Sequence, residues 1–297
     1  MKQILNFGSL NIDHVYSVEH IVSPGETIGS LGLAVYPGGK GLNQSIALAR
    51  AGAQVAHVGM VGDDGAFLVD LLKESGVDCG YIRRQSELPS GHAIIQVDRS
   101  GQNAILLHEG ANHAFTTEYI DHVLAENNSK SLILLQNEIN LVVYIIESAK
   151  KCGHDVALNP SPFDRNLMDC DFGHVDILLL NEIEGRELSG ADEADAILDY
   201  LKNKYPQMSV VLTLGGDGSA LLKDGVIYRQ DIHEMPVADT TAAGDSFTGY
   251  FLAGLLAGLT PARILRQAAV AAGLAVSRKG AASSIPWALE VGAVLGG

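Results

Sequence analysis

The chain has 297 residues, 47% of them hydrophobic, which suits one large domain or a domain with a small appendage. Its net charge of −15, from 20 basic and 35 acidic residues, argues against a nucleic-acid-binding protein, which needs clustered Lys and Arg. No apolar run reaches the ~20 residues that span a bilayer. The three cysteines, Cys79, Cys152 and Cys170, form no CxxC pair and fit a reducing compartment, so we expect a cytoplasmic protein.

The first predicted strand, residues 3–8, is a short apolar run that ends in a glycine. Asn11 and Asp13 follow it, and the end of a strand is where α/β folds form ligand crevices. On these residues alone, a turn with Asx hydrogen bonds is an equally good interpretation. Residues 15–37 then break into short extended pieces without a helical period, which predicts an antiparallel insertion beside the main sheet.

Residues 37–44 predict a glycine-rich turn that enters a short Ala-rich helix ending near residue 52. The turn is not a Walker A loop, because Lys40 is followed by glycine and not by Ser or Thr. The glycines permit close backbone approach, while Lys40, Asn43 and Gln44 supply polar groups at one end of the helix. Three glycines are a costly way to begin an ordinary helix, so we favour a binding role for a polyhydroxylated ligand.

From residue 55 onward, apolar strands alternate with helical patterns, and polar or glycine-rich residues follow the strands. This regularity predicts an α/β fold with a doubly wound, mostly parallel sheet flanked by helices, and a site along one edge. Residues 91–97 and 103–107 predict a β-hairpin, which we expect to pack with the first insertion as a small β-sheet lid. Strands are predicted at 55–60, 131–135, 155–159, 175–180 and 209–214, and helices at 65–75, 117–127, 140–152 and 261–275.

The most informative stretch is residues 239–249, where small residues at 242–244 precede a long run rich in Ala, Leu and Gly. A helix that begins here would point free N–H groups outward at the positive end of its dipole, which makes an anion site from backbone. Asp245 would lie in the first turn and could take a proton from a hydroxyl while those amides stabilise a transferred phosphoryl group. The alternative is an ordinary capped helix, in which Asp245 only matches the dipole.

Two stretches, Gly38-Gly-Lys-Gly-Leu-Asn43-Gln and Asp239-Thr-Thr-Ala-Ala-Gly-Asp245, resemble the two signatures of the PfkB family of carbohydrate kinases, in the family's order. Asn181-Glu-x-Glu184 resembles the family's magnesium-associated N-x-x-E motif. One departure is Ala242, where the broader family usually has glycine. Within the family the chain is most similar to the ribokinase branch, through Asn11-x-Asp13-His14, Asn137-Glu138, Ala157-Leu-Asn-Pro160, Val276-Ser-Arg-Lys-Gly-Ala281 and Pro286-Trp287.

The resemblance implies one ribokinase-like α/β domain over residues 1–297, with lid insertions at about 12–38 and 91–107. It implies that Asp245 accepts the proton of the 5-hydroxyl of D-ribose, and that the backbone amides of Ala242, Ala243 and Gly244 hold the γ-phosphoryl group of ATP. The implied sugar contacts, besides Asp245, are Asn11, Asp13, Gly39, Lys40, Asn43 and Glu138, and the implied nucleotide contacts are Asn181, Thr213, Gly215, Gly218 and Gly244.

The resemblance also implies two metal ions and a homodimer formed by lid-to-lid contact. Glu184, with Asn181, would organise Mg²⁺ through water. A monovalent cation, K⁺, would be enclosed by Asp239, by the carbonyls of Thr241, Ala275, Arg278 and Gly280, and by Ser284.

Two other functions stay open at this point. The first is the same chemistry on another substrate, such as 2-deoxyribose, another pentose or a nucleoside such as adenosine. The second is a sugar-binding regulator on a kinase fold that has lost catalysis. The intact Asp245, Glu184 and glycine-rich loops argue against the second function, because a non-catalytic descendant has no need to keep the base.

Overall fold

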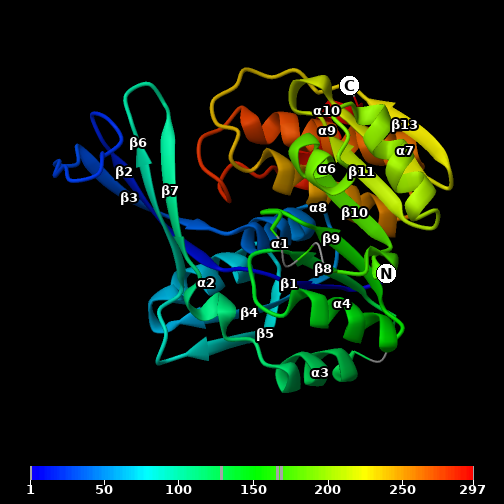
Figure 1. The fold of residues 1–297 in the computed structure, drawn as a ribbon, viewed down its shortest axis with the longest axis horizontal. Helices are drawn as coiled ribbons and strands as arrows, with labels where there is room; N and C mark the ends of the chain where they lie inside the picture. Colours follow the sequence, from blue (N-terminus) through cyan, green and yellow to red (C-terminus); the bar gives the residue numbers. More distant parts are fainter. Residues whose placement is uncertain (1, 128–129, 165–166, 168–169, 297) are drawn as a thin grey trace.

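The computed structural model describes residues 2–127, 130–164, 167 and 170–296, and in them nine strands form one large sheet (Figure 1). The strands from β5 to β11 run parallel, and two further strands add antiparallel at one edge. The predicted α/β class is therefore confirmed. In sheet order the strands are β13 (Val226–Gln230), β12 (Ser219–Lys223), β11 (Ser209–Thr213), β10 (Ile177–Asn181), β9 (Asp155–Asn159), β8 (Leu132–Gln136), β1 (Ile4–Phe7), β4 (Val55–Gly62) and β5 (Asp78–Gln85).

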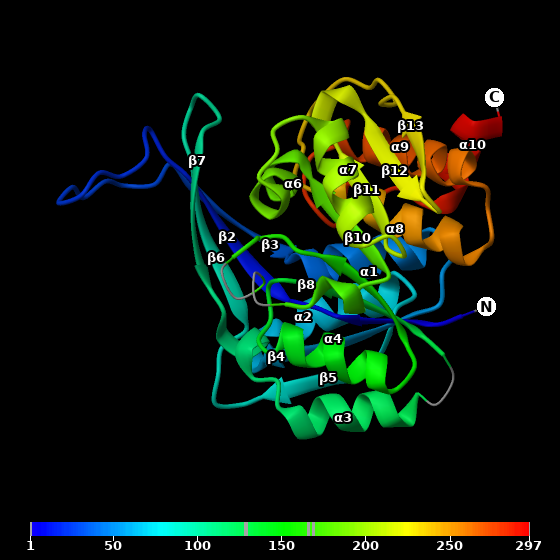
Figure 2. The same ribbon diagram turned by 45° about the vertical axis from the view of Figure 1, so that its right-hand side comes forward.

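Helices cover both faces of this sheet (Figures 1 and 2). Among the described residues, none of them is long and apolar enough to cross a membrane. They are α1 (Lys40–Arg50), α2 (Ala66–Glu74), α3 (Thr117–Glu126), α4 (Val142–Lys151), α6 (Glu182–Ser189), α7 (Ala194–Lys204), α8 (Ala243–Leu256), α9 (Pro261–Val276) and α10 (Ala288–Gly296).

The alternation of side chains along the strands divides the interior into two cores. In β8, Leu132 and Leu134 pack with residues of α1, α2, α8 and α9, whereas Ile133 and Leu135 pack with residues of α3, α4 and α7. Successive strand residues point to opposite faces, and a parallel sheet between two helix layers must be apolar on both. This explains why residues 131–135 form a continuous apolar run and not an alternating one.

Several elements of the main body were not predicted from the sequence, among them the helices α6 and α7. The edge strand β5 carries Asp78, Arg83 and Arg84 at exposed positions, so it lacks the apolar run that marked the central strands. The β12–β13 hairpin turns at Asp224 and Gly225, whose φ angles of 51° and 75° are both positive, as the shortest hairpin loops require. An Asp-Gly pair is a hairpin signal that the sequence analysis did not use. The C-terminal helix α10 was also not predicted.

A second sheet of four strands stands beside the body, and its distal end projects away from it (Figures 1 and 2). It consists of two hairpins, as predicted from the two insertions, and the hairpins join through parallel pairing of β2 with β6. The lid sheet is defined by these strands, in the order β3 (Gly32–Gly38), β2 (Asn11–Ser17), β6 (Gly91–Val97) and β7 (Asn103–His108).

The helices α1 and α8 cross at very short range. A Cβ atom added to Gly249 of α8 would lie 2.3 Å from the Cβ of Ala47 in α1, so only glycine permits this approach. Helix α1 already begins at Lys40, which places most of the predicted glycine-rich turn in the first turns of the helix. The crossing therefore holds the first turns of α1 and α8 against each other, at the place where both sequence signatures lie.

Candidate active site

Asp245 lies in the first turn of α8, as predicted, and only 6% of its surface is exposed. Its Oδ2 accepts a hydrogen bond from Asn43 Nδ2 and its Oδ1 accepts one from Gln44 Nε2, both at 3.0 Å. Burial raises the pKa of Asp245, while the Lys40 ammonium and the two amide donors oppose that rise. The carboxylate is thus oriented from both sides and is a better proton acceptor than an exposed aspartate.

Lys40 and Glu138 form a second polar group next to Asp245. Glu138 Oε2 accepts hydrogen bonds from Ser9 Oγ at 2.5 Å and from the Lys40 backbone N–H at 2.9 Å. Burial raises the pKa of Glu138. Burial lowers the pKa of Lys40, but the charges of Asp245, Glu138 and Glu184 more than offset this effect and hold that pKa above its ordinary value. One ammonium therefore lies among three carboxylates.

Asp13 joins this group from β2, at the base of the lid sheet. Burial, together with the charge of Glu138, raises the pKa of Asp13 to about 6. A Cβ atom on Gly38 of the neighbouring strand β3 would lie 2.0 Å from Asp13 Oδ2, so glycine at this position makes room for the carboxylate. The structure therefore brings Asp13 together with Lys40 and Glu138, as expected for a sugar site.

Asn11, the first residue of β2, is held by a residue that the sequence analysis did not select. Asn112 Nδ2 donates to Asn11 Oδ1 at 2.7 Å, and Asn112 Oδ1 accepts from the Leu10 N–H at 2.9 Å. The only sequence signal for Asn112 was its place in the loop that leaves the lid. These bonds use the side-chain oxygen of Asn11 and leave its amino group for a ligand.

The Oδ1 atom of Asn43 is buried and, within the described part of the chain, has no hydrogen-bond partner. Leaving a buried acceptor unsatisfied costs about 1–3 kcal/mol, so such an atom is unusual outside a functional site. Because the Nδ2 of the same amide is fixed on Asp245, Oδ1 has a set direction. A ligand hydroxyl beside Asp245 would satisfy it.

Asn181 and Glu184, at the start of α6, form a reciprocal helix cap. Asn181 Oδ1 accepts from the Glu184 N–H at 2.9 Å, and Glu184 Oε2 accepts from the Asn181 N–H at 3.0 Å. The N-x-x-E pattern thus has a structural explanation, which leaves the second carboxylate oxygen of Glu184 unused by the cap. A cavity of about 160 Å³ is lined by both residues and also by Lys40 and Asp245. A hydrated Mg²⁺ fits these groups, because it prefers one or two carboxylates with several waters.

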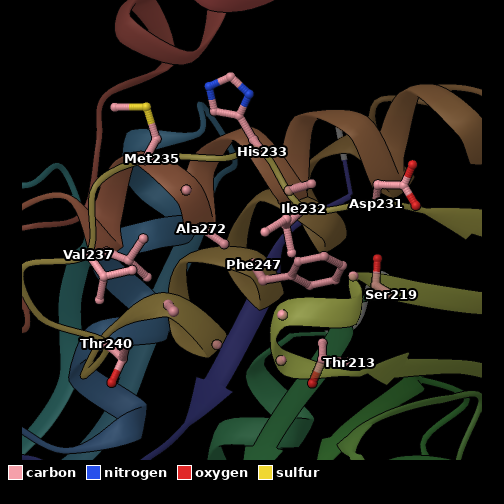
Figure 3. Close-up of a pocket in the computed structure, with 18 residues that line it drawn as sticks. Thr213, Ser219, Asp231, Ile232, His233, Met235, Val237, Thr240, Phe247 and Ala272 are labelled. Carbon is pink, nitrogen blue, oxygen red and sulfur yellow. The ribbon is translucent and has the colours of Figure 1, made fainter.

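A larger cavity of about 360 Å³ adjoins this one, since Thr213, Gly244 and Phe247 line both. The predicted residues Gly215 and Gly218 also line it. Figure 3 shows the Phe247 ring in the middle of the lining, with Thr213 and Thr240 towards one end and His233 and Met235 at the other. The apolar part of the wall was not predicted, because it comes from an irregular segment and one helix face: Ile232, Met235, Val237, Ala269 and Ala272.

The start of α8 faces both cavities through Gly244, as an anion site requires. Of the three amides expected to form that site, the Ala243 N–H donates to the Thr240 carbonyl at 3.2 Å. That amide is therefore committed within the loop. The amides of Ala242 and Gly244 make no such backbone bond within the described residues, and they are the free donors among the three.

Asp239 contacts two of the residues expected around K⁺, Thr241 and Gly280. Its Oδ1 accepts from the Thr241 N–H at 3.0 Å, and its Oδ2 accepts from the Gly280 N–H at 2.9 Å. The Arg278 guanidinium is directed away to Glu290 Oε1 at 2.5 Å, so it does not compete for the carbonyl groups. A carboxylate among carbonyls fits a hard monovalent cation. Of the remaining expected ligands, the Ala275 carbonyl accepts the Arg278 N–H, and Ser284 is buried with its hydroxyl donating to the Ala281 carbonyl.

Helix α1 also reaches the 278–287 segment at its other end. Arg50 Nη1 donates to the carbonyls of Ala282 at 3.0 Å and Ile285 at 2.6 Å, and its guanidinium lies 4.9 Å from the centroid of the Trp287 ring. One helix therefore contacts Asp245 through Asn43 and Gln44 near its start and the 278–287 segment at its end.

The profile of the pfkB family carbohydrate kinases matches residues 1–288. The chain is 35% identical over 294 residues to the ribokinase of Haemophilus influenzae, which covers 96% of this chain and 95% of that protein. The ribokinase of Cryptococcus neoformans in complex with ADP superposes with a TM-score of 0.88 at 32% identity, covering 99% of this chain and 100% of that one. The Arabidopsis thaliana ribokinase complexed with ribose and ATP gives 0.87 at 30% identity, covering 99% and 98%.

The raised pKa of Asp13 predicts that removing its charge stabilises the ligand-free protein. The pKa of the Asp13 carboxyl is about 6 in the folded protein and its ordinary 3.8 in the unfolded chain. The free energy of unfolding therefore falls as the pH rises from about 4 through 6. We expect Asp13→Asn to raise the free energy of unfolding at pH 8 by roughly 2 kcal/mol, an advantage that vanishes at pH 4. Thermal melting between pH 4 and pH 8 measures it.

The same substitution should remove a sugar contact, so affinity for the sugar should fall while stability rises. The exposed Asp199 of α7 is the control, and Asp199→Asn should give no pH-dependent gain. A gain for Asp13→Asn that is equal at pH 4 and pH 8 would contradict the charge-burial explanation.

Proposed function

The chain belongs to the pfkB family of carbohydrate kinases and is an ATP-dependent sugar kinase, and we propose that its substrate is D-ribose, phosphorylated at the 5-hydroxyl. The observation that carries the proposal is the position of Asp245. It is buried, oriented by two amide donors, and lines with Lys40 the 160 Å³ cavity that adjoins the larger one. The ribokinase complexed with ribose and ATP supports the same ligands here.

In the proposed complex, the sugar lies between the base of the lid sheet and the first turn of α1. The Asp13 carboxylate and the free Oδ1 of Asn43 accept hydrogen bonds from its hydroxyls, while the Asn11 amino group donates. Glu138 is engaged by the Lys40 N–H through Oε2 and has a second oxygen for a hydroxyl. Gly39 keeps the backbone open at this end, with a φ of 94°. A set of charged and neutral acceptors suits a polyol, because an unpaired hydroxyl would strongly weaken binding.

The transfer step follows from the same geometry. The oxygen of the 5-hydroxyl attacks the γ-phosphorus of ATP, its proton moves to Asp245, and the bond from the γ-phosphorus to the bridging oxygen breaks to release ADP. The free amides of Ala242 and Gly244 stabilise the charge on the transferred group, and the Lys40 ammonium lies beside it. Positioning and charge stabilisation account for most of catalysis in such a loose transition state.

Asn181 and Glu184 would hold Mg²⁺ through water next to the phosphates, and the ion would neutralise their charge. The apolar cavity around Phe247 would take the adenine, with Thr213, Gly215 and Gly218 along its wall. The chain would act as one α/β domain with the two lid insertions, whose strands lie at 11–38 and 91–108.

The substrate proposal predicts that D-ribose far exceeds 2-deoxy-D-ribose, fructose and adenosine in an ADP-release assay with Mg-ATP and K⁺ at matched concentrations. Asp245→Asn should lower kcat for ribose by at least about a hundredfold, because the base is lost, and leave ribose affinity nearly unchanged. Calorimetric titration of ribose into the variant checks the second part.

A different leading substrate would keep the kinase chemistry and move the assignment to another sugar or to a nucleoside. Sugar binding without any ATP-dependent turnover in the unsubstituted protein would instead favour a non-catalytic regulator.

We propose that K⁺ binds at Asp239 and orders the loop that leads to Asp245. Replacing K⁺ by tetramethylammonium should then cut turnover, since this cation is too large for the site. Asp239→Asn should weaken the activation, so that more K⁺ is needed for half-maximal rate. Rates measured at constant ionic strength distinguish a site effect from screening. Equal turnover in both salts would sink the proposal.

We also propose a homodimer formed by the lid sheets. On the face that carries Asp13, the strand register places Tyr36, Ile105 and Leu107, which are 48%, 60% and 45% exposed. Exposed apolar side chains mark a protein interface. The opposite face of the lid sheet is also apolar, with Leu33, Val35 and Leu106 at 55%, 50% and 66% exposed, so matched substitutions on the two faces decide which one pairs. Sedimentation should show a dimer, and Ile105→Glu should dissociate it. Leu106→Glu, on the opposite face, is the matched control and should remain dimeric; a monomeric unsubstituted protein would refute this arrangement.

A further inference from the structure

A chain of five buried polar side chains runs from Asp245 into the main sheet. Three of them come from adjacent strands: Asn6 of β1, His57 of β4 and Gln136 of β8. The other two, Gln44 and Ser45, lie on α1, and all five side chains are 0% exposed. Polar groups are rarely buried so deeply in a sheet unless a specific network needs them.

The strand alternation explains how these residues meet. Asn6 pairs with His57 across β1 and β4, and in each strand the residue two positions earlier, Ile4 or Val55, belongs to the core beneath α1. Gln136 likewise follows Leu134 on that face of β8. Three neighbouring strands therefore each place a polar residue below α1, where their other residues are apolar.

The hydrogen bonds connect without a gap from the sheet to Asp245. Starting at the sheet, they link the Gly8 carbonyl to His57 Nε2 (3.2 Å), His57 Nδ1 to Ser45 Oγ (2.8 Å), Ser45 Oγ to Asn6 Nδ2 (2.8 Å), Asn6 Oδ1 to Gln136 Nε2 (3.0 Å), Gln136 Nε2 to Gln44 Oε1 (2.8 Å) and Gln44 Nε2 to Asp245 Oδ1 (3.0 Å).

The direction of each bond is fixed from the sheet end. The Gly8 carbonyl can only accept, so His57 Nε2 carries the hydrogen. Burial lowers the pKa of His57 to about 4, which makes the ring neutral and leaves Nδ1 as an acceptor. Ser45 must then donate to Nδ1, and its oxygen must accept from Asn6.

The two central amides carry this direction on to Asp245. Asn6 Nδ2 donates both to Ser45 Oγ and to the Gly41 carbonyl at 2.8 Å, so Asn6 Oδ1 faces Gln136. Gln136 Nε2 donates its two hydrogens to Asn6 and to Gln44 Oε1. The Gln44 oxygen is therefore occupied, and only its amino group can face the carboxylate. Within the described residues Gln136 Oε1 is buried without a hydrogen-bond partner. This orientation of the Gln136 amide therefore carries the free-energy cost of one unsatisfied acceptor.

We infer that Asn6, His57 and Gln136 are positioning residues for the base: through Gln44 they ensure that Asp245 always meets an amide donor and never an amide oxygen. This inference deepens the proposed function and rests on Asp245 being the base. Without the hydrogen bond from Gln136, the Gln44 amide could rotate by 180° and place its oxygen against the carboxylate of Asp245. Two oxygens in contact would repel, which would favour the protonated, inactive form of Asp245.

The test measures the pH dependence of kcat for ribose in Gln136→Met, which keeps the shape of the side chain and removes both donors. We expect kcat at pH 7 to fall about tenfold or more, and its acidic limb to move up by about one pH unit. KM values for ribose and ATP should stay within about twofold, because Gln136 is fully buried, lines neither cavity and is not one of the proposed sugar contacts. The other charged groups around Asp245, namely Lys40, Glu138 and Glu184, are unchanged in the variant.

Two controls distinguish a positioning role of Gln136 from a role in stability alone. Leu132→Ala, on the same strand and face and equally buried, should lose stability and keep the pH profile of kcat. In a double-mutant cycle, Gln136→Met should add nothing further once Gln44→Leu has removed the amide through which it acts.

If Gln136→Met does not fold, Asn6→Leu provides the second variant, since it removes the acceptor that orients Gln136 and should give the same shifted limb. An unshifted limb in a folded variant, or additive losses in the cycle, would overturn the inference. Absence of ribose turnover in the unsubstituted protein would instead count against the proposed function.

Discussion

The contact between the first turns of α1 and α8 is the constraint on which the rest of this site depends. The helices can approach closely only because Gly249 lacks a side chain opposite Ala47. That approach lets Asn43 and Gln44 reach Asp245 from two sides. With one larger side chain at the crossing, the two sequence signatures would still exist, but the base would lose the donors that orient it. The orientation of Asp245 thus depends on how closely α1 and α8 pack.

Around this contact the protein gathers carboxyl groups that would be more stable in water. Burial raises the pKa of Asp13, Glu138 and Asp245, and Lys40 is the ammonium that the structure places among them. Charges buried in this way destabilise the empty protein and favour any ligand that supplies hydroxyl donors or a phosphate. The raised energy of the empty site is therefore part of what selects a polyol and a nucleotide. Much of the stability of the chain must come from the two apolar cores on either side of the sheet.

The sequence predicted those parts of the fold that depend on local patterns. Apolar runs, glycine-terminated helices and the two insertions predicted the parallel sheet and the lid sheet, and the two signatures predicted Asp245, Lys40 and Asn43. Strand β5 escaped because Asp78, Arg83 and Arg84 interrupt its apolar residues, as charged residues often do in an edge strand. The apolar wall of the larger cavity escaped because Ile232, Met235 and Val237 have no regular period. Asn112 and the Asn6–His57–Gln136 row escaped because their role lies in contacts between residues far apart in the chain.

The tight α1–α8 crossing also limits how this protein can change during evolution. The contact between Gly249 and Ala47 offers almost no side chains to vary. Substitutions there would disturb the orientation of Asp245 before they alter the choice of sugar. The lid sheet is the opposite case, because β2 carries Asp13 into the site while much of the lid is exposed. New substrate preferences should therefore arise by drift in the hairpins while the helical crossing stays invariant. Laboratory evolution towards other sugars would accordingly find most of its productive variation in β2, β3, β6 and β7.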